Sequence, residues 1–340
     1  MSNATPLSPM AKPRFGRDLL SQVPNELFQN PAVFVQPEPW SLVSRFFDPE
    51  RCHVHEVTSM EHELVRSVAE PLGDRSAIFG IGGGSAIDMA KYVAAEHNLP
   101  LVLLPSILSV DAAFTRAAAV REGSLVRYLK SVVPDHLLID FGLLKQAPPL
   151  LNRAGAADVL SIFTALWDWR EASVVEGEPY DPKVAEQSRV LLDRLLSHAS
   201  QIRDCSDQGL RLLAELFVGE VALCEQVGTS RPEEGSEHYL AYCVERLTGR
   251  SFIHGQLVGL CIDVVGRIQG QDVAPIRRFL KEAGLDCSLE AVGVTQDELR
   301  KALTMMKEFV AGESHLLPGV FHFRPAIGAK EADRLVAELD

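Results

Sequence analysis

AIFGIGGGSAIDMAK, Ala77 to Lys91, is the stretch that decides the fold of this chain. Its apolar start is typical of a buried strand, four glycines follow within five residues, and the remainder has apolar residues at helical spacing. A strand that enters a helix through glycines lets an anion approach the backbone and the positive end of the helix dipole. The turn is neither a Walker A loop nor a complete G-x-G-x-x-G motif, because Ser85 stands at the last glycine. It therefore indicates either a phosphate site or a glycine turn that only packs helix close to sheet.

Around this stretch, the first part of the chain alternates between strand-like and helical segments. Apolar spacing predicts helices at 60–73 and 85–98. Short apolar runs predict strands at 32–36, 52–57, 76–82, 99–106 and 136–141. This alternation indicates an open parallel sheet covered on both faces, the setting in which nucleotides bind at the carboxyl ends of the strands.

Beyond about residue 147, long helical patterns dominate and convincing strands are absent. Apolar stripes predict helices at 155–175, 182–202, 207–228, 238–247, 255–270, 273–285 and 295–312. We expect an α/β chain with an open parallel-sheet, Rossmann-like, dinucleotide-binding domain at 1–147 and an all-helical metal- and substrate-binding domain at 148–340. The first ten residues, polar and rich in proline, are expected to be a loose leader.

Composition narrows the classes of partner. The 340 residues carry a formal net charge of -13, which argues against a nucleic-acid partner and against an anionic membrane surface. The six cysteines are scattered without a C-x-x-C pair, as in reduced, buried thiols. No run is long and apolar enough to span a bilayer, and no secretory signal pattern opens the chain. We therefore expect a soluble, cytoplasmic protein without membrane insertion.

The loop after the fourth predicted strand is a second candidate for ligand contact. It reads PSILSVDAAFT, Pro105 to Thr115, and it carries Ser106, Ser109 and Asp111. Because it follows a strand of the same sheet, it faces the same crevice as the glycine turn. Asp111 is either a ligand-contacting carboxylate or an ordinary helix cap.

Three residues of the helical half are candidate metal ligands. Asp158 lies early in a strongly apolar helix, while His238 and His254 each stand near a helix start. Asp158 either complements the helix dipole or faces a cation, and a lone histidine is often an ordinary satisfied side chain. An aspartate and two histidines together would leave coordination positions open for substrate, as catalytic metal sites do.

The segments GIGGGSAIDMAK, LPSILSVDAAF, RAGAADVLS, TALWDW, SRPEEGSEH and HGQLVGL occur in this order. In that order they resemble the superfamily of iron- or zinc-dependent polyol dehydrogenases and 3-dehydroquinate synthases. The resemblance extends from about Phe15 to Phe323 and is strongest to glycerol-1-phosphate dehydrogenases, with SVDAAFT also similar to glycerol dehydrogenase. It implies a metal-dependent oxidoreductase that interconverts a small polyol or polyol phosphate and its ketone. A carbocycle-forming, dehydroquinate-synthase-like lyase with retained NAD is the alternative, and a member that binds nucleotide without turnover is a third reading.

The resemblance also implies a set of site residues. NAD or NADP would place its pyrophosphate on Gly82, Gly83, Gly84 and Ser85, with Asp88 beside it and Ser106 and Ser109 on the nicotinamide side. One divalent metal, Zn, Fe or Ni, would be held by Asp158, His238 and His254, with Asp111 near the substrate hydroxyls. Such a metal polarises the substrate hydroxyl for hydride transfer. Members of the superfamily are commonly homo-oligomers.

Several positions depart from the pattern of these relatives. Ile162 stands where glycerol-1-phosphate dehydrogenases usually have a lysine, and Tyr242 where they have a histidine. Both changes remove groups that would hold a substrate phosphate. The synthases carry a glutamate at Asp158 and a lysine at Ser161, which counts against a true dehydroquinate synthase. Glu38 is a weak substitute for the usual ribose-binding aspartate, so the choice between NAD and NADP stays open.

Overall fold

The computed structural model describes residues 10–339 except residues 71 and 124, so most of the expected N-terminal leader lies outside the described residues. The chain forms two compact units, the first ending at Pro148 and the second beginning at Pro149. Strands occur in the first unit, and the described part of the second consists of helices and loops. The expected fold class, a parallel-sheet part followed by an all-helical part, is confirmed.

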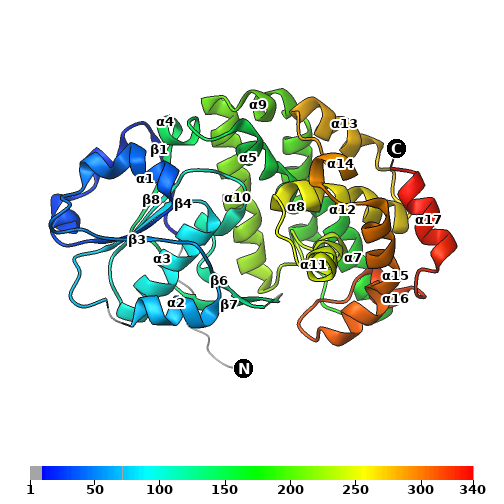
Figure 1. Cartoon of the computed structure of the whole chain (residues 1–340). Helices are drawn as coiled ribbons and strands as arrows, with labels where there is room; N and C mark the ends of the chain where they lie inside the picture. The colour runs from blue at the N-terminus through cyan, green and yellow to red at the C-terminus, as the bar shows by residue number, and fades with distance from the viewer. Residues whose placement is uncertain (1–9, 71, 124, 340) are drawn as a thin grey trace. The chain divides into compact units, whose positions relative to one another are not determined.

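A six-stranded parallel sheet forms the centre of the first unit (Figure 1). Its strands are β1 (Arg14–Gly16), β2 (Ala32–Val35), β3 (His53–Glu56), β4 (Ile78–Gly82), β5 (Leu101–Pro105) and β8 (His136–Asp140), in the order β1-β8-β5-β4-β2-β3. The chain passes from β2 to β3 in one direction and from β4 to β5 in the other, so the order reverses between β2 and β4. Phe34 pairs with Gly80 and Val35 with Ile81 at this junction. Ligands bind α/β sheets where such a reversal occurs.

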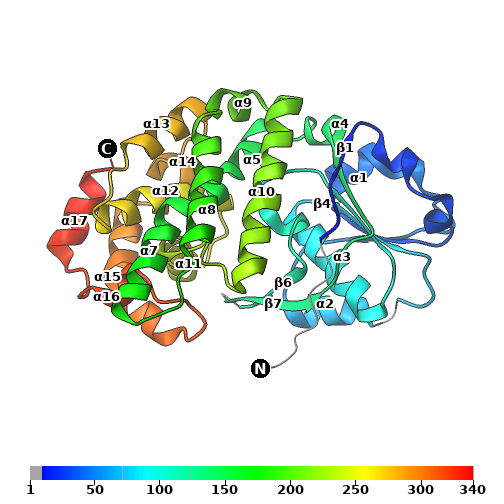
Figure 2. The ribbon, with the colours of Figure 1, turned by 180° about the vertical axis from the view of Figure 1, so that it is seen from behind.

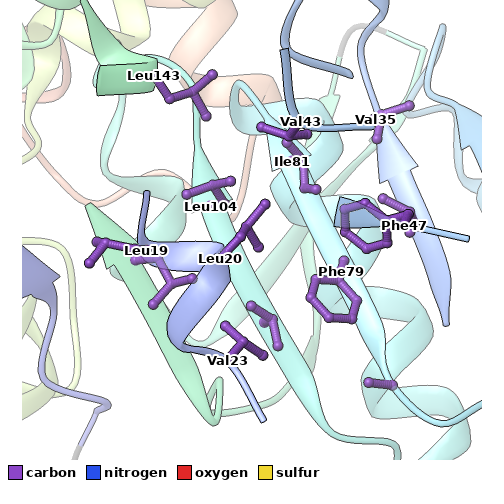
Figure 3. Packing of buried hydrophobic residues seen from close by; sticks show 14 residues of the cluster. Leu19, Leu20, Val23, Val35, Val43, Phe47, Phe79, Ile81, Leu104 and Leu143 are labelled. Atoms are coloured by element: carbon purple, nitrogen blue, oxygen red, sulfur yellow. The ribbon is translucent and has the colours of Figure 1, made fainter. Parts of the chain in front are cut away.

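Side chains of β4 alternate between the two faces of the sheet. Phe79 and Ile81 join a buried apolar cluster with Leu19, Leu20 and Val43 (Figure 3). Gly80 has the opposite orientation along the strand, and a Cβ there would lie 2.7 Å from the Cβ of Ala90 in helix α3 (Gly84–His97). The glycine therefore allows α3 to pack directly on β4, and apolar burial on both faces holds the sheet together.

The remaining elements of the first unit include some that the sequence did not indicate. Helix α2 (His62–Ala69) and α3 match predicted helices, and α1 (Pro37–Val43) and α4 (Phe141–Leu144) are additional. Strand β1 and the antiparallel hairpin of β6 (Ala117–Glu122) and β7 (Leu125–Ser131) are also additional. The hairpin packs against α3, as Figure 1 shows. Strand β6 begins with three alanines and ends in Arg121 and Glu122, and Arg127 and Lys130 interrupt the apolar residues of β7, so neither strand resembles a long buried apolar run.

The second unit is a helical domain in which the long helices α8 (Pro182–Leu196) and α10 (Asp207–Val227) pack side by side (Figure 2). Two predicted helices are each divided in the structure: 155–175 forms α6 and α7, which meet at Ser161, and 182–202 forms α8 and the shorter α9 that follows it. The helices are α5 (Pro149–Ala154), α6 (Ala156–Leu160), α7 (Ile162–Val175), α8 (Pro182–Leu196), α9 (Ala199–Asp204), α10 (Asp207–Val227), α11 (Ser236–Thr248), α12 (His254–Ile268), α13 (Ala274–Ala283), α14 (Leu289–Val292), α15 (Gln296–Gly312), α16 (Val320–Phe323) and α17 (Ala329–Ala337). At the break, the Ser161 hydroxyl shares its proton between the carbonyl oxygens of Asp158, three residues earlier, and Glu233, 72 residues later.

Candidate functional site

Asp158, His238 and His254 come together in the second unit from helices α6, α11 and α12. One ligand atom from each lies within 4.8 Å of the other two. Nε2 of His254 lies 3.3 Å from Nε2 of His238 and 3.4 Å from Oδ1 of Asp158. The His254 side chain is one third exposed and the other two are nearly buried. The cluster is therefore reached from solvent on the His254 side.

The spacing of these atoms fits a bound divalent metal. Two ligands at about 2.1 Å from a tetrahedral Zn²⁺ are about 3.4 Å apart, as two of the three pairs are here. Oδ1 of Asp158 is buried and accepts no hydrogen bond from the described residues. A buried carboxylate oxygen without a donor is costly unless a cation meets it. The three residues thus fit a metal site with an open coordination position.

A close backbone contact sets the position of His254. A Cβ at the next residue, Gly255, would lie 1.9 Å from the carbonyl oxygen of Ala154 at the end of α5. Only glycine fits between these two backbone segments. The start of α12 can therefore lie against the segment that leads into α6 and Asp158. The dipeptide His254-Gly255 is thus the local sequence feature that places this histidine.

Glu237 orients His238, and sequence reasoning missed it. Its Oε1 lies 2.9 Å from Nδ1 of His238, and it also accepts from the backbone N–H of Gly235 at 2.7 Å. The other oxygen, Oε2, accepts from the hydroxyl of Thr164 at 2.6 Å. A carboxylate on Nδ1 fixes the tautomer and turns the Nε2 lone pair toward the ligand cluster. The available signal was an acidic residue directly before the histidine.

The Asp168 side chain of α7 accepts a hydrogen bond from the backbone at the start of α11. One oxygen accepts from the N–H of Ser236 at 2.7 Å, and the other from the N–H of Val320 at 2.8 Å and from the Gln269 amide at 3.0 Å. Burial raises the pKa of Asp168 to about 6, although its hydrogen bonds to Ser236 oppose this shift. The carboxylate anchors two helix starts at once, and one of them carries His238.

Negative charge accumulates around His238. Burial lowers the pKa of this imidazole, but the hydrogen bond that it donates to Glu237 and the charges of Glu234, Glu237 and Asp158 outweigh burial and raise the pKa to about 9. Three carboxylates therefore surround a group that is uncharged when it binds a metal. A divalent cation held by these side chains would meet favourable negative charge on several sides.

In the first unit, the glycine turn joins β4 to α3 as expected. A Cβ on Gly82 would lie 2.6 Å from Oε1 of Gln36 and 2.8 Å from the Cβ of Ala86, and the residue has φ 157°. Gln36, at the end of β2, accepts from the N–H of Gly83 at 2.7 Å. Gly83 has no side-chain oxygen to cap α3, which leaves first-turn N–H groups as donors for an anion. Gln36 is a second residue that sequence reasoning missed.

The β5–β6 loop, residues 106–116, lies against this turn. Ser106 donates its backbone N–H to the carbonyl of Gly82 at 2.9 Å. Added Cβ atoms would lie 2.9 Å from Ile107 at Gly83 and 3.2 Å from Val110 at Gly84. The remaining predicted residues differ in exposure: Ser85 is exposed, Ser109 and Asp111 are partly buried, and Ser106 is buried. The structure thus brings the loop and the turn together within the first unit.

Asp88 is placed differently from the simple expectation of a carboxylate beside a pyrophosphate. It is buried, and its Oδ1 lies 2.7 Å from the ammonium of fully buried Lys91. Burial raises the pKa of Asp88, while the charge and hydrogen bond of Lys91 lower it. The carboxylate therefore pairs with Lys91, and its contact with a cofactor stays a prediction.

The two positions that depart from the relatives have different surroundings. Ile162 is fully buried in the helical unit. Tyr242 lies one helical turn after His238, with the two ring centroids 6.1 Å apart, and its hydroxyl donates to Oε1 of Glu234 at 3.1 Å. A phenol and a carboxylate thus lie beside the candidate metal ligands, at the position where the resemblance in sequence leads us to expect a histidine.

The chain is similar in sequence to known dehydrogenases. The sequence pattern of the family described as iron-containing alcohol dehydrogenase matches residues 41–148. A glycerol-1-phosphate dehydrogenase [NAD(P)+] of Sulfurisphaera tokodaii is 31% identical over 76% of this chain and 75% of its own length. The enzyme of the same name from Hyperthermus butylicus is 31% identical over 68% of this chain and 66% of its own length, slightly under two thirds.

Among solved structures, a probable glycerol dehydrogenase of Sinorhizobium meliloti has a similar fold. The TM-score is 0.73 at 18% identity, and the match covers 99% of this chain and 98% of that one. At this identity the likeness is one of fold alone.

Proposed function

This chain belongs to the family of the glycerol-1-phosphate dehydrogenases, and from that premise we propose that it is a metal-dependent NAD(P) oxidoreductase. Its substrate is a small polyol or polyol phosphate, which it interconverts with the corresponding ketone. The observation that carries the proposal is the cluster of Asp158, His238 and His254, in which a buried carboxylate oxygen has no donor. The names of its relatives and the glycine turn at the sheet's point of reversal support the nucleotide part.

The proposed metal-binding residues lie in the second unit and the proposed cofactor-binding residues in the first. Asp158, His238 and His254 would hold one divalent cation, with His238 kept in its metal-binding tautomer by Glu237. Gly82 to Ser85 would bind the cofactor pyrophosphate, and Ser106, Ser109 and Asp111 would line the loop beside it. When bound, the cation supplies Lewis acidity toward a substrate oxygen and the dinucleotide supplies a hydride donor or acceptor.

We propose that the substrate end near the metal ligands is uncharged. Glu234 and Tyr242 form a hydrogen-bonded pair beside His238, and Glu237 adds a second carboxylate. A phosphate dianion placed there would meet these charges at short range, whereas hydroxyl groups would find acceptors. The pair therefore favours a polyol hydroxyl at this position.

Turnover tests the reaction class. The purified protein, loaded with Zn²⁺ or Fe²⁺, is expected to change the absorbance of NAD(P)H at 340 nm with glycerol, dihydroxyacetone or their phosphates. Asp158→Ala and His254→Ala should lose both bound metal and turnover. His198→Ala, in the same helical unit, is the matched control, because His198 is not a candidate metal ligand and its Nδ1 hydrogen-bonds the carbonyl oxygen of Arg194.

Two results would overturn the proposal. One is phosphate release from a sugar phosphate without net change at 340 nm, which would favour the lyase. The other is a protein that takes up no metal and whose Asp158→Ala and His254→Ala variants behave like the parent.

Location and assembly belong to the same proposal. In the described residues, no helix is long and apolar enough to cross a membrane. We propose a cytoplasmic homo-oligomer, in line with the resemblance in sequence. Light scattering after size-exclusion chromatography measures the assembly state, and a monomeric mass would contradict it.

A further inference from the structure

We infer that Lys91 is a positioning residue that holds the β5–β6 loop against the glycine turn and thereby sets the affinity for the nucleotide. The inference rests on the proposed function, because it concerns the nucleotide half of that site. Lys91 lies on α3 and is completely buried, and the hydrogen bonds of its ammonium go to Ala112, Thr115 and Ala117 of the loop and β6. It acts through the loop backbone.

Five oxygen atoms surround the Lys91 ammonium. It donates to the carbonyl of Ala112 at 2.8 Å, to the hydroxyl and carbonyl of Thr115 at 3.1 and 3.4 Å, and to the carbonyl of Ala117. The fifth is Oδ1 of Asp88, 2.7 Å away. Four of the five belong to the end of the β5–β6 loop and the first residue of β6. An ammonium has three N–H donors, so these acceptors share it as one clamp.

The clamp is needed because this part of the loop has little other regular structure. Residues 106–116 contain a single 3-10 turn, Asp111–Ala113, between β5 and the hairpin. The start of the loop is tied to the turn by the Ser106–Gly82 hydrogen bond, and its end is tied to α3 by Lys91. Asp111 lies between the two ties. Fixing both ends of the loop therefore restricts the positions of Asp111 and Ser109 relative to the start of α3.

Because the Lys91 ammonium is buried, it requires these particular acceptors. A buried ammonium is tolerated only with a counter-charge and satisfied donors, and Asp88 and the loop carbonyls supply these. Asp88 in turn lies on the same helix three residues earlier, so the pair forms within α3 and presents one preset donor group to the loop. A merely structural lysine would stabilise the unit without changing how its folded form binds nucleotide.

The test compares Lys91→Met, Asp88→Asn and Lys130→Met. Lys130→Met is the matched control, because Lys130 is an exposed lysine that pairs with Glu96 of α3. The readouts are the Kd of NADH and NADPH from fluorescence titration and hydrogen exchange of residues 106–116. Bound metal, measured by elemental analysis, reports the other unit.

Lys91→Met is expected to raise the Kd of the folded protein at least tenfold and to speed exchange across the loop, with bound metal unchanged. Lys130→Met is expected to change the Kd less than threefold, and Asp88→Asn, which removes the counter-charge of Lys91, serves as the reference for the double variant. If Lys91→Met does not fold, the double variant Asp88→Asn/Lys91→Met, which leaves no unpaired buried charge, is measured against Asp88→Asn.

Parent-like Kd and exchange in the folded lysine variant would overturn the inference. An equal rise of the Kd in Lys130→Met would also overturn it, because the effect would then not depend on the contacts of Lys91 with the loop. A parent protein that binds neither NADH nor NADPH would instead overturn the proposed function, while the exchange comparison would still decide whether Lys91 holds the loop.

Discussion

Nε2 of His238 and Nε2 of His254 lie 3.3 Å apart, although 16 residues separate them in sequence. The Nδ1 of His238 is already engaged by Glu237, so both imidazoles turn their second nitrogen into the same small space. The two nitrogens cannot both carry a proton at this distance, so at least one of them presents a lone pair. One cation shared by the two nitrogens and Asp158 satisfies all three groups.

Glu237→Gln should weaken metal binding about tenfold, and Glu237→Ala up to about 100-fold, because His238 loses the charged partner that orients it. Glutamine keeps the shape, so the first variant isolates the effect of charge. Competition with a chromogenic chelator measures the affinity. Glu186→Gln, an exposed glutamate of α8, is the control. Equal metal affinity in all the variants would show that Glu237 has no such role.

Glu234→Gln should raise the ratio of kcat/KM for glycerol 1-phosphate to that for glycerol by about five- to tenfold. Removing one charge near the substrate relieves about 1 kcal/mol of repulsion at an effective dielectric constant between those of protein and water. Tyr242→Phe keeps the carboxylate and should leave a smaller effect. Steady-state kinetics with both substrates supply the ratio, and a ratio unchanged in Glu234→Gln would contradict an uncharged substrate end at this place.

Gly82→Ala should destabilise the first unit by about 1–3 kcal/mol, because the added methyl meets Ala86 and the Gln36 side chain. It should also weaken NADH binding by more than tenfold while bound metal stays at the level of the parent. Thermal unfolding and fluorescence titration are the measurements. Gly312→Ala, where a Cβ would meet nothing within 4 Å, should leave both unchanged. Parent-like nucleotide binding in Gly82→Ala would remove the turn from the site.

Asp168 should make the stability of the helical unit depend on pH. Burial raises the pKa of Asp168 from 3.8 to about 6, so the folded protein holds a proton that the unfolded chain has released between these values. The stabilisation is fully present below the unfolded pKa and is lost as pH rises through about 6, by roughly 3 kcal/mol in all.

Urea unfolding of the parent and of Asp168→Asn from pH 4.5 to 7.5 measures this dependence. Asparagine does not titrate, so the parent should lose stability relative to the variant as pH increases. Asp193→Asn in α8 is the control. A difference between parent and Asp168→Asn that stays constant with pH would refute the assignment.

Much of the fold could be predicted because its signals are local. The apolar run and glycines at Ile78–Gly84 mark a buried strand and a turn within seven residues, and β2, β5 and β8 are equally compact runs. The hairpin β6–β7 was missed because its stability comes from packing on α3 and from cross-strand pairing, which local pattern does not reveal.

The site residues also divide into those that local sequence indicates and those whose roles depend on contacts with distant residues. Asp158, His238 and His254 could be proposed from residue type and resemblance, and the structure places them together. Glu237, Gln36 and Lys91 could not, because their roles depend on contacts across 47 residues for Gln36 and 21 for Lys91, and on a side-chain direction for Glu237. The break of the helix at Ser161 likewise depends on an acceptor 72 residues away.

The carboxylate of Asp168 has a consequence for synthesis of the chain. Its partners Ser236, Gln269 and Val320 follow it by 68, 101 and 152 residues. While the ribosome is still making α12, this carboxylate has only part of its donors and cannot be buried without loss of hydrogen bonds. The hydrogen bonds that support the start of α11 are therefore complete only in a chain that includes the segment around Val320, and a chain that ends before it lacks one donor to Asp168.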